Sequence, residues 1–247
     1  MNEKIDFIVL NKTDIKDYDE IVGGITPKGR MSFYGRSLKK NTSKNAYALD
    51  MFNKAEILYD CKENKTLQLL KSASLKDSFR HIKENLDYQS VCFIFAELIN
   101  RVIDGSDLYE LTLNFFNDLK EYPESLTLFN LNLALILKRE GIYPEVNACV
   151  ISGNKTDIKA VSVPDGGFIS KEYLNSDSII LNKDDLRAFR LINLAGYKDR
   201  DKLLNLGINN VIITDLLLDF IEYHLSLKLK SRLFFDEYYQ GKTNLTN

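Results

Sequence analysis

Short stretches of alternating apolar and polar residues fill the first 75 positions of the chain, a pattern typical of half-buried β-strands. Ile5, Phe7 and Val9 mark the first of these strands. Residues 20–26 form a second one, and the glycine pair at 23–24 predicts a bulge or a sharp bend within it. The N-terminal part of the chain is therefore predicted to be a sheet.

A third strand is predicted at residues 30–36, directly after the turn-forming segment 27–29. Because side chains alternate along a strand, its polar residues share one face, while Met31 and Phe33 point to the other. The residues of the polar face are Arg30, Ser32, Tyr34 and Arg36. This strand thus offers two cations and an aromatic ring to one side of the sheet.

Two further strands are predicted at residues 47–59 and 66–72. A polar loop, 38–45, precedes them, and the polar link 62–65 joins them. About five short strands in some 75 residues favour a small closed barrel over an open sheet, because closure removes exposed strand edges.

The period of the apolar positions changes from two to about 3.6 after residue 74, which predicts helices. Apolar stripes run through residues 91–102, 108–119 and 129–137, and Gly141 is a helix stop. Segment 147–174 breaks the pattern and predicts a small β-hairpin.

Helices resume near residue 185, and a long one is predicted at 214–238. The fold class is therefore α+β. We expect a barrel domain at residues 1–76 and a helical domain at 77–247, with an insert at 147–174.

Charge is distributed unevenly along a chain whose net charge is only −2. Residues 28–44 hold six of its 33 basic residues and no Asp or Glu, which leaves 27 basic and 35 acidic residues elsewhere. We interpret this stretch as a positive patch on an acidic body.

A barrel that binds nucleic acid needs cations along the phosphate path and aromatic rings for bases to stack on. The predicted nucleic-acid-binding residues are Lys28, Arg30, Tyr34, Arg36, Lys39, Lys40 and Lys44. The alternative is a solvated basic face that keeps the barrel soluble. A second basic run, at 228–232, either complements a helix dipole or extends a binding surface.

The insert has the spacing of a zinc site without its ligands. A Cys-x-x-Cys pair is replaced by Cys149 and Ser152, and a second pair by Ser170 and Tyr173. Because one thiolate cannot make a structural zinc site, we expect no metal here and a hairpin held by packing.

The chain has three cysteines and two histidines, and none lies in a catalytic or redox motif. His81 and His224 lack partners at a catalytic spacing, so we expect no catalytic residue and no cofactor. The polar N-terminus and the absence of a long apolar run favour a soluble cytoplasmic protein that contacts no membrane.

Several segments, in this order, resemble the bacterial RecO family of recombinational DNA repair proteins. They are Ile-Thr-Pro-Lys-Gly-Arg at 25–30, Tyr-Gly-Arg-Ser-Leu-Lys-Lys at 34–40, Ser43-Lys44, Leu-Asp-Met-Phe at 49–52, Leu-Lys-Arg-Glu-Gly-Ile-Tyr-Pro at 137–144, Cys149, Gly166-Gly167, and His224-Leu225 followed by Leu-Lys-Ser at 229–231. Their order and spacing make the match specific.

The resemblance implies an OB-fold barrel, a helical domain and a zinc-finger-like insert, here without the zinc ligands. It also implies binding of single- and double-stranded DNA, annealing of complementary strands, and RecR as a partner. RecO-like proteins help to load RecA onto DNA coated by single-strand-binding protein, and they bind the acidic C-terminal tail of that protein. The resemblance therefore implies a nucleoid-associated protein that is not an enzyme.

Two other functions remain open at this point. In one, the protein is a non-catalytic protein–protein adaptor whose barrel is only a docking module. In the other it is a nuclease or metal hydrolase, for which the chain lacks a cluster of Asp, Glu and His ligands.

Overall fold

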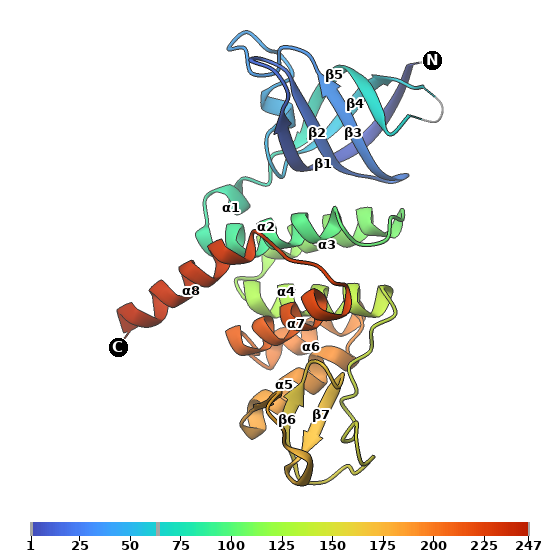
Figure 1. Ribbon diagram of the computed structural model, residues 1–247. Coiled ribbons are helices and arrows are strands. Elements are labelled where there is room, and N and C mark those ends of the chain that lie inside the picture. The colour runs from blue at the N-terminus through green and yellow to red at the C-terminus, as the bar shows by residue number, and fades with distance from the viewer. Residues whose placement is uncertain (1, 63–64, 247) are drawn as a thin grey trace. The chain divides into compact units, whose positions relative to one another are not determined.

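The computed structural model describes residues 2–62 and 65–246 (Figure 1). The chain forms two compact units, Met1–Glu121 and Tyr122–Asn247, and each is described by itself.

Five strands of the first unit close into a barrel with the order β1-β2-β3-β5-β4. All neighbours pair antiparallel except β3 and β5, which run parallel. The strands are β1 (Asn2–Asp14), β2 (Glu20–Thr26), β3 (Gly29–Gly35), β4 (Lys54–Asp60) and β5 (Leu67–Asp77). The predicted OB-like barrel is confirmed, while positions 63 and 64 of the predicted link lie outside the described residues.

Aromatic rings fill the centre of the barrel, as strand alternation predicts. Phe33 is fully buried, and its ring meets those of Phe7 and Tyr59 at centroid distances of 5.0 and 5.3 Å. These edge-to-face contacts fix Phe33 inside the barrel, so its neighbours on β3 point outward.

The bulge predicted at the glycine pair of β2 is wrong, because β2 is continuous and the irregularity lies opposite it on β1. Val9 pairs with Gly24 and Asn11 with Gly23, so one residue of β1 is extra. A Cβ on Gly24 would lie 2.0 Å from the carbonyl oxygen of Ile8. The glycines therefore allow the bulged strand to approach closely.

The strand predicted at 47–59 begins later than expected. Its first residues form a 3₁₀ helix, Tyr47–Leu49, and β4 starts only at Lys54. Phe52, with φ of 66°, turns the chain between the two. Its buried ring packs 5.1 Å from that of Phe93 on the helical side of this unit.

Three helices complete the first unit: α1 (Arg80–Lys83), α2 (Leu86–Ile99) and α3 (Asp107–Glu121). Phe116 of α3 joins them to the barrel, since its ring contacts both Phe52 and Phe79. Barrel and helices therefore share apolar contacts within one unit.

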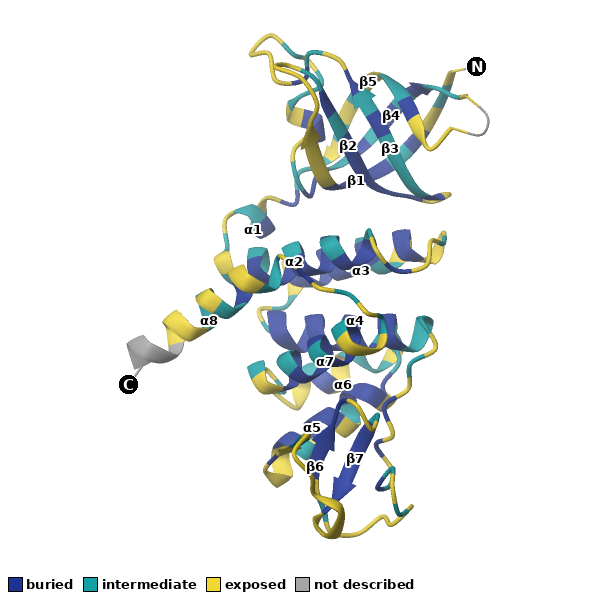
Figure 2. Ribbon diagram, in the orientation of Figure 1, coloured by how far each residue is buried: buried dark blue, intermediate teal, exposed yellow. Residues whose placement is uncertain are grey.

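The second unit is built around α4, which is buried along most of its length (Figure 2). Gly141, with φ of 82°, ends that helix as predicted. The elements of this unit are α4 (Ser125–Arg139), β6 (Ile158–Ser162), β7 (Gly167–Ser170), the 3₁₀ helix Lys171–Tyr173, β8 (Ser178–Ile180), α5 (Lys183–Leu194), the 3₁₀ helix Tyr197–Asp199, α6 (Arg200–Asn205), α7 (Val211–His224) and α8 (Arg232–Thr246). No helix within the described residues is long and apolar enough to cross a membrane.

The single long helix predicted at 214–238 is wrong, because the chain breaks between α7 and α8. Ser226 adopts φ of 52°, which ends α7. The Glu222 carboxylate then accepts the backbone N–H of Leu229 at 2.7 Å and the Arg232 guanidinium at 2.7 Å. These bonds replace helical ones, and apolar periodicity does not reveal them.

Strands β6, β7 and β8 form a three-stranded antiparallel sheet with the order β7-β6-β8. The predicted hairpin at 147–174 is thus part of a slightly larger sheet, whose third strand lies just beyond the predicted insert.

Candidate nucleic-acid interface

Strand β3 carries the predicted basic face with one difference at its end. Arg30, Ser32 and Tyr34 are half-buried on the outer face, whereas β3 stops at Gly35 and Arg36 lies in the following turn. A Cβ on Gly35 would lie 2.1 Å from the Leu38 side chain, so the chain folds tightly back here. Arg36 is therefore an exposed loop residue and not a strand residue as predicted.

Acidic residues from distant segments meet the first half of the basic stretch. Lys28 forms a 3.0 Å ion pair with Glu3 of β1. Asp104, between α2 and α3, lies 3.5 Å from the Arg30 guanidinium and accepts its backbone N–H at 2.9 Å. The Lys28 ammonium, followed by the Cys61 thiol and the Tyr59 hydroxyl, lowers the pKa of Glu3 to about 2.

The loop that joins β1 to β2 supplies carboxylates to the second half. Asp19 accepts hydrogen bonds from the Tyr34 hydroxyl and, at 2.7 Å, from the backbone N–H of Ser37. The Ser37 N–H, and then Tyr34, lower the pKa of Asp19, and the Asp19 carboxylate raises that of Tyr34. Lys39 pairs with Asp14 at 2.6 Å, which raises the lysine pKa.

Residues 28–44 contain no Asp or Glu, but acidic residues from other parts of the chain contact them in the structure. Four of its seven predicted binding residues hold a carboxylate. The other three, Arg36, Lys40 and Lys44, are exposed and make no ion pair within residues 2–62 and 65–246. These three cations are the ones available to a phosphate backbone without first losing a partner.

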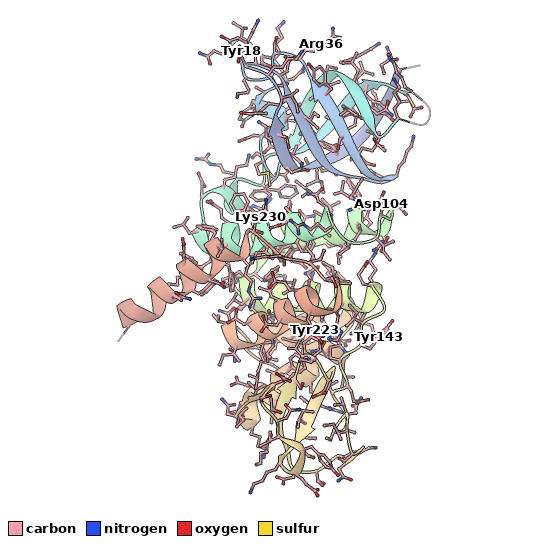
Figure 3. All side chains as sticks on the ribbon, viewed as in Figure 1. Tyr18, Arg36, Asp104, Tyr143, Tyr223 and Lys230 are labelled. Atoms are coloured by element: carbon pink, nitrogen blue, oxygen red, sulfur yellow. The ribbon has the colours of Figure 1, made fainter. Side chains whose placement is uncertain are left out.

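Tyr18 belongs to the same end of the barrel and was missed by the sequence analysis. It lies in the β1–β2 loop with 53% of its surface exposed, and the Lys40 ammonium is 5.2 Å from its ring centroid. Figure 3 shows Tyr18 and Arg36 at the same end of the barrel. Its position in the first barrel hairpin, a common ligand-binding loop of OB folds, was the signal that could have found it.

The insert brings three of its four zinc-ligand positions together. Burial opposes ionisation of the Cys149 thiol, but the Ser152 hydroxyl and the backbone groups of Ser152 and Ser170 lower its pKa to about 6. The Ser170 hydroxyl is buried without a hydrogen-bond partner among the described residues. Tyr173 is 36% exposed, and its hydroxyl takes no part in this arrangement. One sulfur and two hydroxyls do not fit zinc, and the described part of the chain holds no cluster of three or more His, Cys, Asp or Glu side chains suited to a metal.

Both histidines are bonded to backbone carbonyls. His81 Nε2 lies 2.9 Å from the Phe116 oxygen, and burial lowers its pKa. His224 Nε2 lies 2.8 Å from the Val163 oxygen. Each ring therefore has a structural partner.

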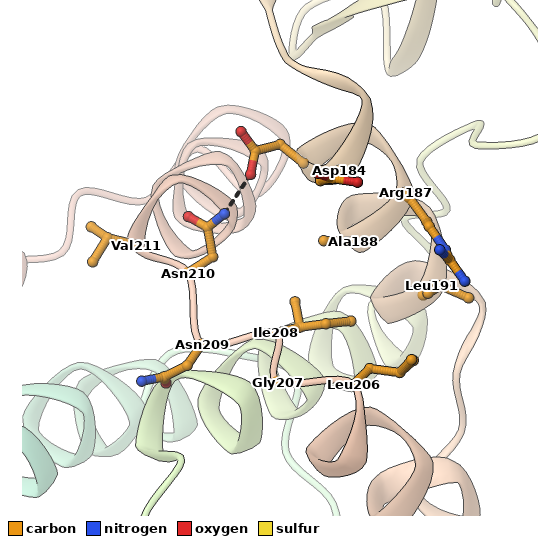
Figure 4. Close-up of a pocket in the computed structure, with 11 residues that line it drawn as sticks. Asp184, Arg187, Ala188, Leu191, Leu206, Gly207, Ile208, Asn209, Asn210 and Val211 are labelled. Carbon is orange, nitrogen blue, oxygen red and sulfur yellow. Dashed lines mark hydrogen bonds between the residues drawn. The ribbon is translucent and has the colours of Figure 1, made fainter.

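A hollow of about 560 Å³ lies between α5 and the loop that precedes α7 (Figure 4). Leu191 and Leu206 contribute apolar walls. Asp185, which lines this hollow, accepts hydrogen bonds from the side-chain amides of Asn210 and Asn182. These two residues cap the N-termini of α7 and α5, so the carboxylate has a structural role.

Comparison with known proteins decides the family. The family model described as "Recombination protein O N terminal" matches residues 1–79, and the one described as "Recombination protein O C terminal" matches residues 83–233. The chain belongs to the RecO family. This confirms the resemblance carried by the sequence segments.

Individual RecO relatives match over most of their length. The protein named DNA repair protein RecO from Oceanobacillus iheyensis is 24% identical over 250 residues, covering 96% of this chain and 94% of its own. That from Bacillus subtilis is 26% identical over 245 residues, with 96% and 95% covered. That from Syntrophomonas wolfei is 26% identical over 199 residues, with 76% of each chain covered.

Proposed function

We propose that this RecO-family protein acts in DNA repair and homologous recombination as a non-catalytic mediator. It binds single- and double-stranded DNA through the barrel and anneals complementary strands. With RecR it assists RecA loading on DNA coated by single-strand-binding protein, whose acidic C-terminal tail it contacts. It works in the bacterial cytoplasm, associated with the nucleoid.

One observation carries the DNA-binding part of this proposal. Arg36, Lys40 and Lys44 are exposed in one loop of a closed OB-like barrel and make no ion pair within the described residues. Loops of such barrels are frequent oligonucleotide sites. Lys39 of the same loop is held in a surface ion pair, which contributes little to stability and can exchange its carboxylate for a phosphate.

Annealing by this surface needs no bond-breaking chemistry. Two DNA strands repel each other through their phosphates, and cations that neutralise part of that charge let base pairing proceed. The protein's contribution is then electrostatic, which predicts a rate that falls as salt rises.

Strand annealing tests the proposal directly. The variant Arg36→Glu/Lys40→Glu should slow annealing of complementary oligonucleotides and weaken binding to both strand types. The control, Lys155→Glu/Lys183→Glu, makes the same charge change at exposed lysines of the second unit. Equal annealing rates for both variants would overturn the proposal.

A protein–protein adaptor is the second candidate, and one observation favours it. Four of the seven predicted contacts already hold carboxylates of the chain itself, which lowers the net charge that the barrel presents. An adaptor would show DNA binding that is weak and insensitive to the Arg36→Glu/Lys40→Glu change.

A further inference from the structure

Tyr18 is an aromatic residue that the fold holds at the surface. It lies in the loop between β1 and β2, whose ends are fixed by a 3.1 Å bond from the Ile15 N–H to the Asp19 oxygen. The Tyr18 carbonyl accepts the N–H of Lys39 at 3.1 Å, which ties this loop to the one after β3. The ring is thus exposed on a backbone anchored at several points.

Tyr34, the aromatic residue predicted to stack on bases, is committed to a different task. Its hydroxyl donates to Asp19, and its side chain is half-buried on β3. Because Asp19 directly follows Tyr18, this bond positions the loop that carries the exposed ring. Tyr34 therefore supports the loop, whereas Tyr18 is 53% exposed and its hydroxyl is not needed for the loop bonds.

Cations adjoin the Tyr18 ring on the side of the loop after β3. The Lys40 ammonium lies 5.2 Å from the ring centroid, and a single ammonium covers only one face. Arg36 is exposed in the same loop as Lys40, and Figure 3 shows it at the same end of the barrel as Tyr18. Of the carboxylates at this loop, Asp14 holds Lys39 and Asp19 holds Ser37 and Tyr34. Asp17, directly before Tyr18, is exposed and acts on Lys39 through its charge.

This arrangement matches one unpaired nucleotide and its neighbours. A base stacks on an aromatic face without regard to sequence, and phosphates on either side need cations within reach. In a duplex both faces of each base are already stacked, so the ring has nothing to receive there. We propose that Tyr18 stacks on one unpaired base of single-stranded DNA while Arg36 and Lys40 hold the adjoining phosphates.

The inference rests on the proposed DNA binding and adds a preference for single strands at this end of the barrel. Stacking losses measured by alanine substitution correspond to about fivefold to about 150-fold in affinity. Tyr18→Ala should therefore weaken binding of a single-stranded oligonucleotide at least about fivefold. Binding of a duplex of the same length should stay within about twofold, since the phosphate contacts remain.

The experiment uses the full chain and oligonucleotides that contain 2-aminopurine, a fluorescent base whose emission falls on stacking. The wild type and Tyr18→Phe should quench it, and Tyr18→Ala should not. Tyr143→Ala, which removes an exposed tyrosine of the second unit (69% exposed), is the matched control and should behave as wild type. Circular dichroism melting establishes that each variant is folded.

Two failures are distinguishable. If Tyr18→Ala binds single strands as the wild type does while Arg36→Glu/Lys40→Glu loses binding, the stacking inference is overturned and the proposed function stands. If neither variant affects binding to single strands or duplex, both are overturned.

Discussion

The salt dependence of DNA binding measures how many cations of the barrel contact phosphates. We consider the triple variant Arg36→Gln/Lys40→Gln/Lys44→Gln, which removes the three basic residues of the 28–44 stretch that make no ion pair within the described residues. Each phosphate contact adds about 0.7 to the slope of log K against log salt for a single strand. Losing three contacts should therefore flatten the slope by about 2.

This change is large enough to measure by fluorescence anisotropy. Between 50 and 200 mM salt, a slope difference of about 2 makes the affinity advantage of the wild type shrink about 20-fold. The comparison variant is Lys28→Gln/Lys39→Gln. To contact a phosphate, Lys28 must leave Glu3 and Lys39 must leave Asp14. The two freed carboxylates then attract cations from solution. Net ion release is then smaller, so this pair should change the slope less.

The reasoning would be refuted by the reverse order. If the Lys28→Gln/Lys39→Gln pair flattened the slope more than the triple variant, the ion-paired lysines would be the main phosphate contacts. The interface would then be centred on Lys28 and Lys39, beside Glu3 and Asp14, and not on Arg36, Lys40 and Lys44.

Three further predictions concern single positions. Arg30→Ala should lower the melting temperature and leave the salt slope of DNA binding unchanged, because this guanidinium holds Asp104. Arg36→Ala should flatten the salt slope and leave the melting temperature unchanged. Gly24→Ala should destabilise the protein, since its Cβ would meet a carbonyl oxygen at 2.0 Å, whereas Gly241→Ala should be tolerated. The pKa of the Cys149 thiol is lowered from its ordinary value of 9.0 to about 6 in the folded protein. Ionisation of this thiol therefore stabilises the fold fully at a pH above 9.0, and this stabilisation is lost as the pH falls through about 6. The melting-temperature gap between wild type and Cys149→Ser should therefore widen from pH 6 to 9.

Each of these three predictions would be contradicted by a specific result. A lower salt slope for Arg30→Ala would make it a phosphate contact. Equal melting of the two glycine variants would mean that β1 can move away from β2 at no cost. A pH-independent gap, or a loss of stability on adding a chelator, would show that hydrogen bonds around the Cys149 sulfur are not what holds the insert.

Local patterns predicted the barrel well because its strands obey a strict period. Phe33 is buried where alternation placed it, and the helix stop at Gly141 is where turn chemistry placed it. Two errors came from the same kind of cause. The bulge opposite Gly24 and the break after His224 depend on a partner strand and on the Glu222 carboxylate, which periodicity cannot register.

The candidate site was predictable in its cations but not in their partners. Lys28 and Glu3 are 25 residues apart, and Arg30 and Asp104 are 74 apart. Strand pairing and the packing of helices against the barrel bring them together. Tyr18 was missed for a related reason, since tertiary bonds such as that between its carbonyl and the Lys39 N–H place it beside the basic loop.

The carboxylates at the barrel surface give its basic residues two different roles. Where a carboxylate comes from the loop between α2 and α3, as Asp104 does, the cation joins the barrel to the rest of its unit, and we expect its removal to lower the melting temperature. Where the cation lies in the loop after β3 and lacks such a partner, as Arg36 does, its charge is directed to solvent. A phosphate backbone that follows the strongest local potential should therefore cross the loop end of β3 beside Tyr18, and the Arg30 end of the same strand should stay outside its path.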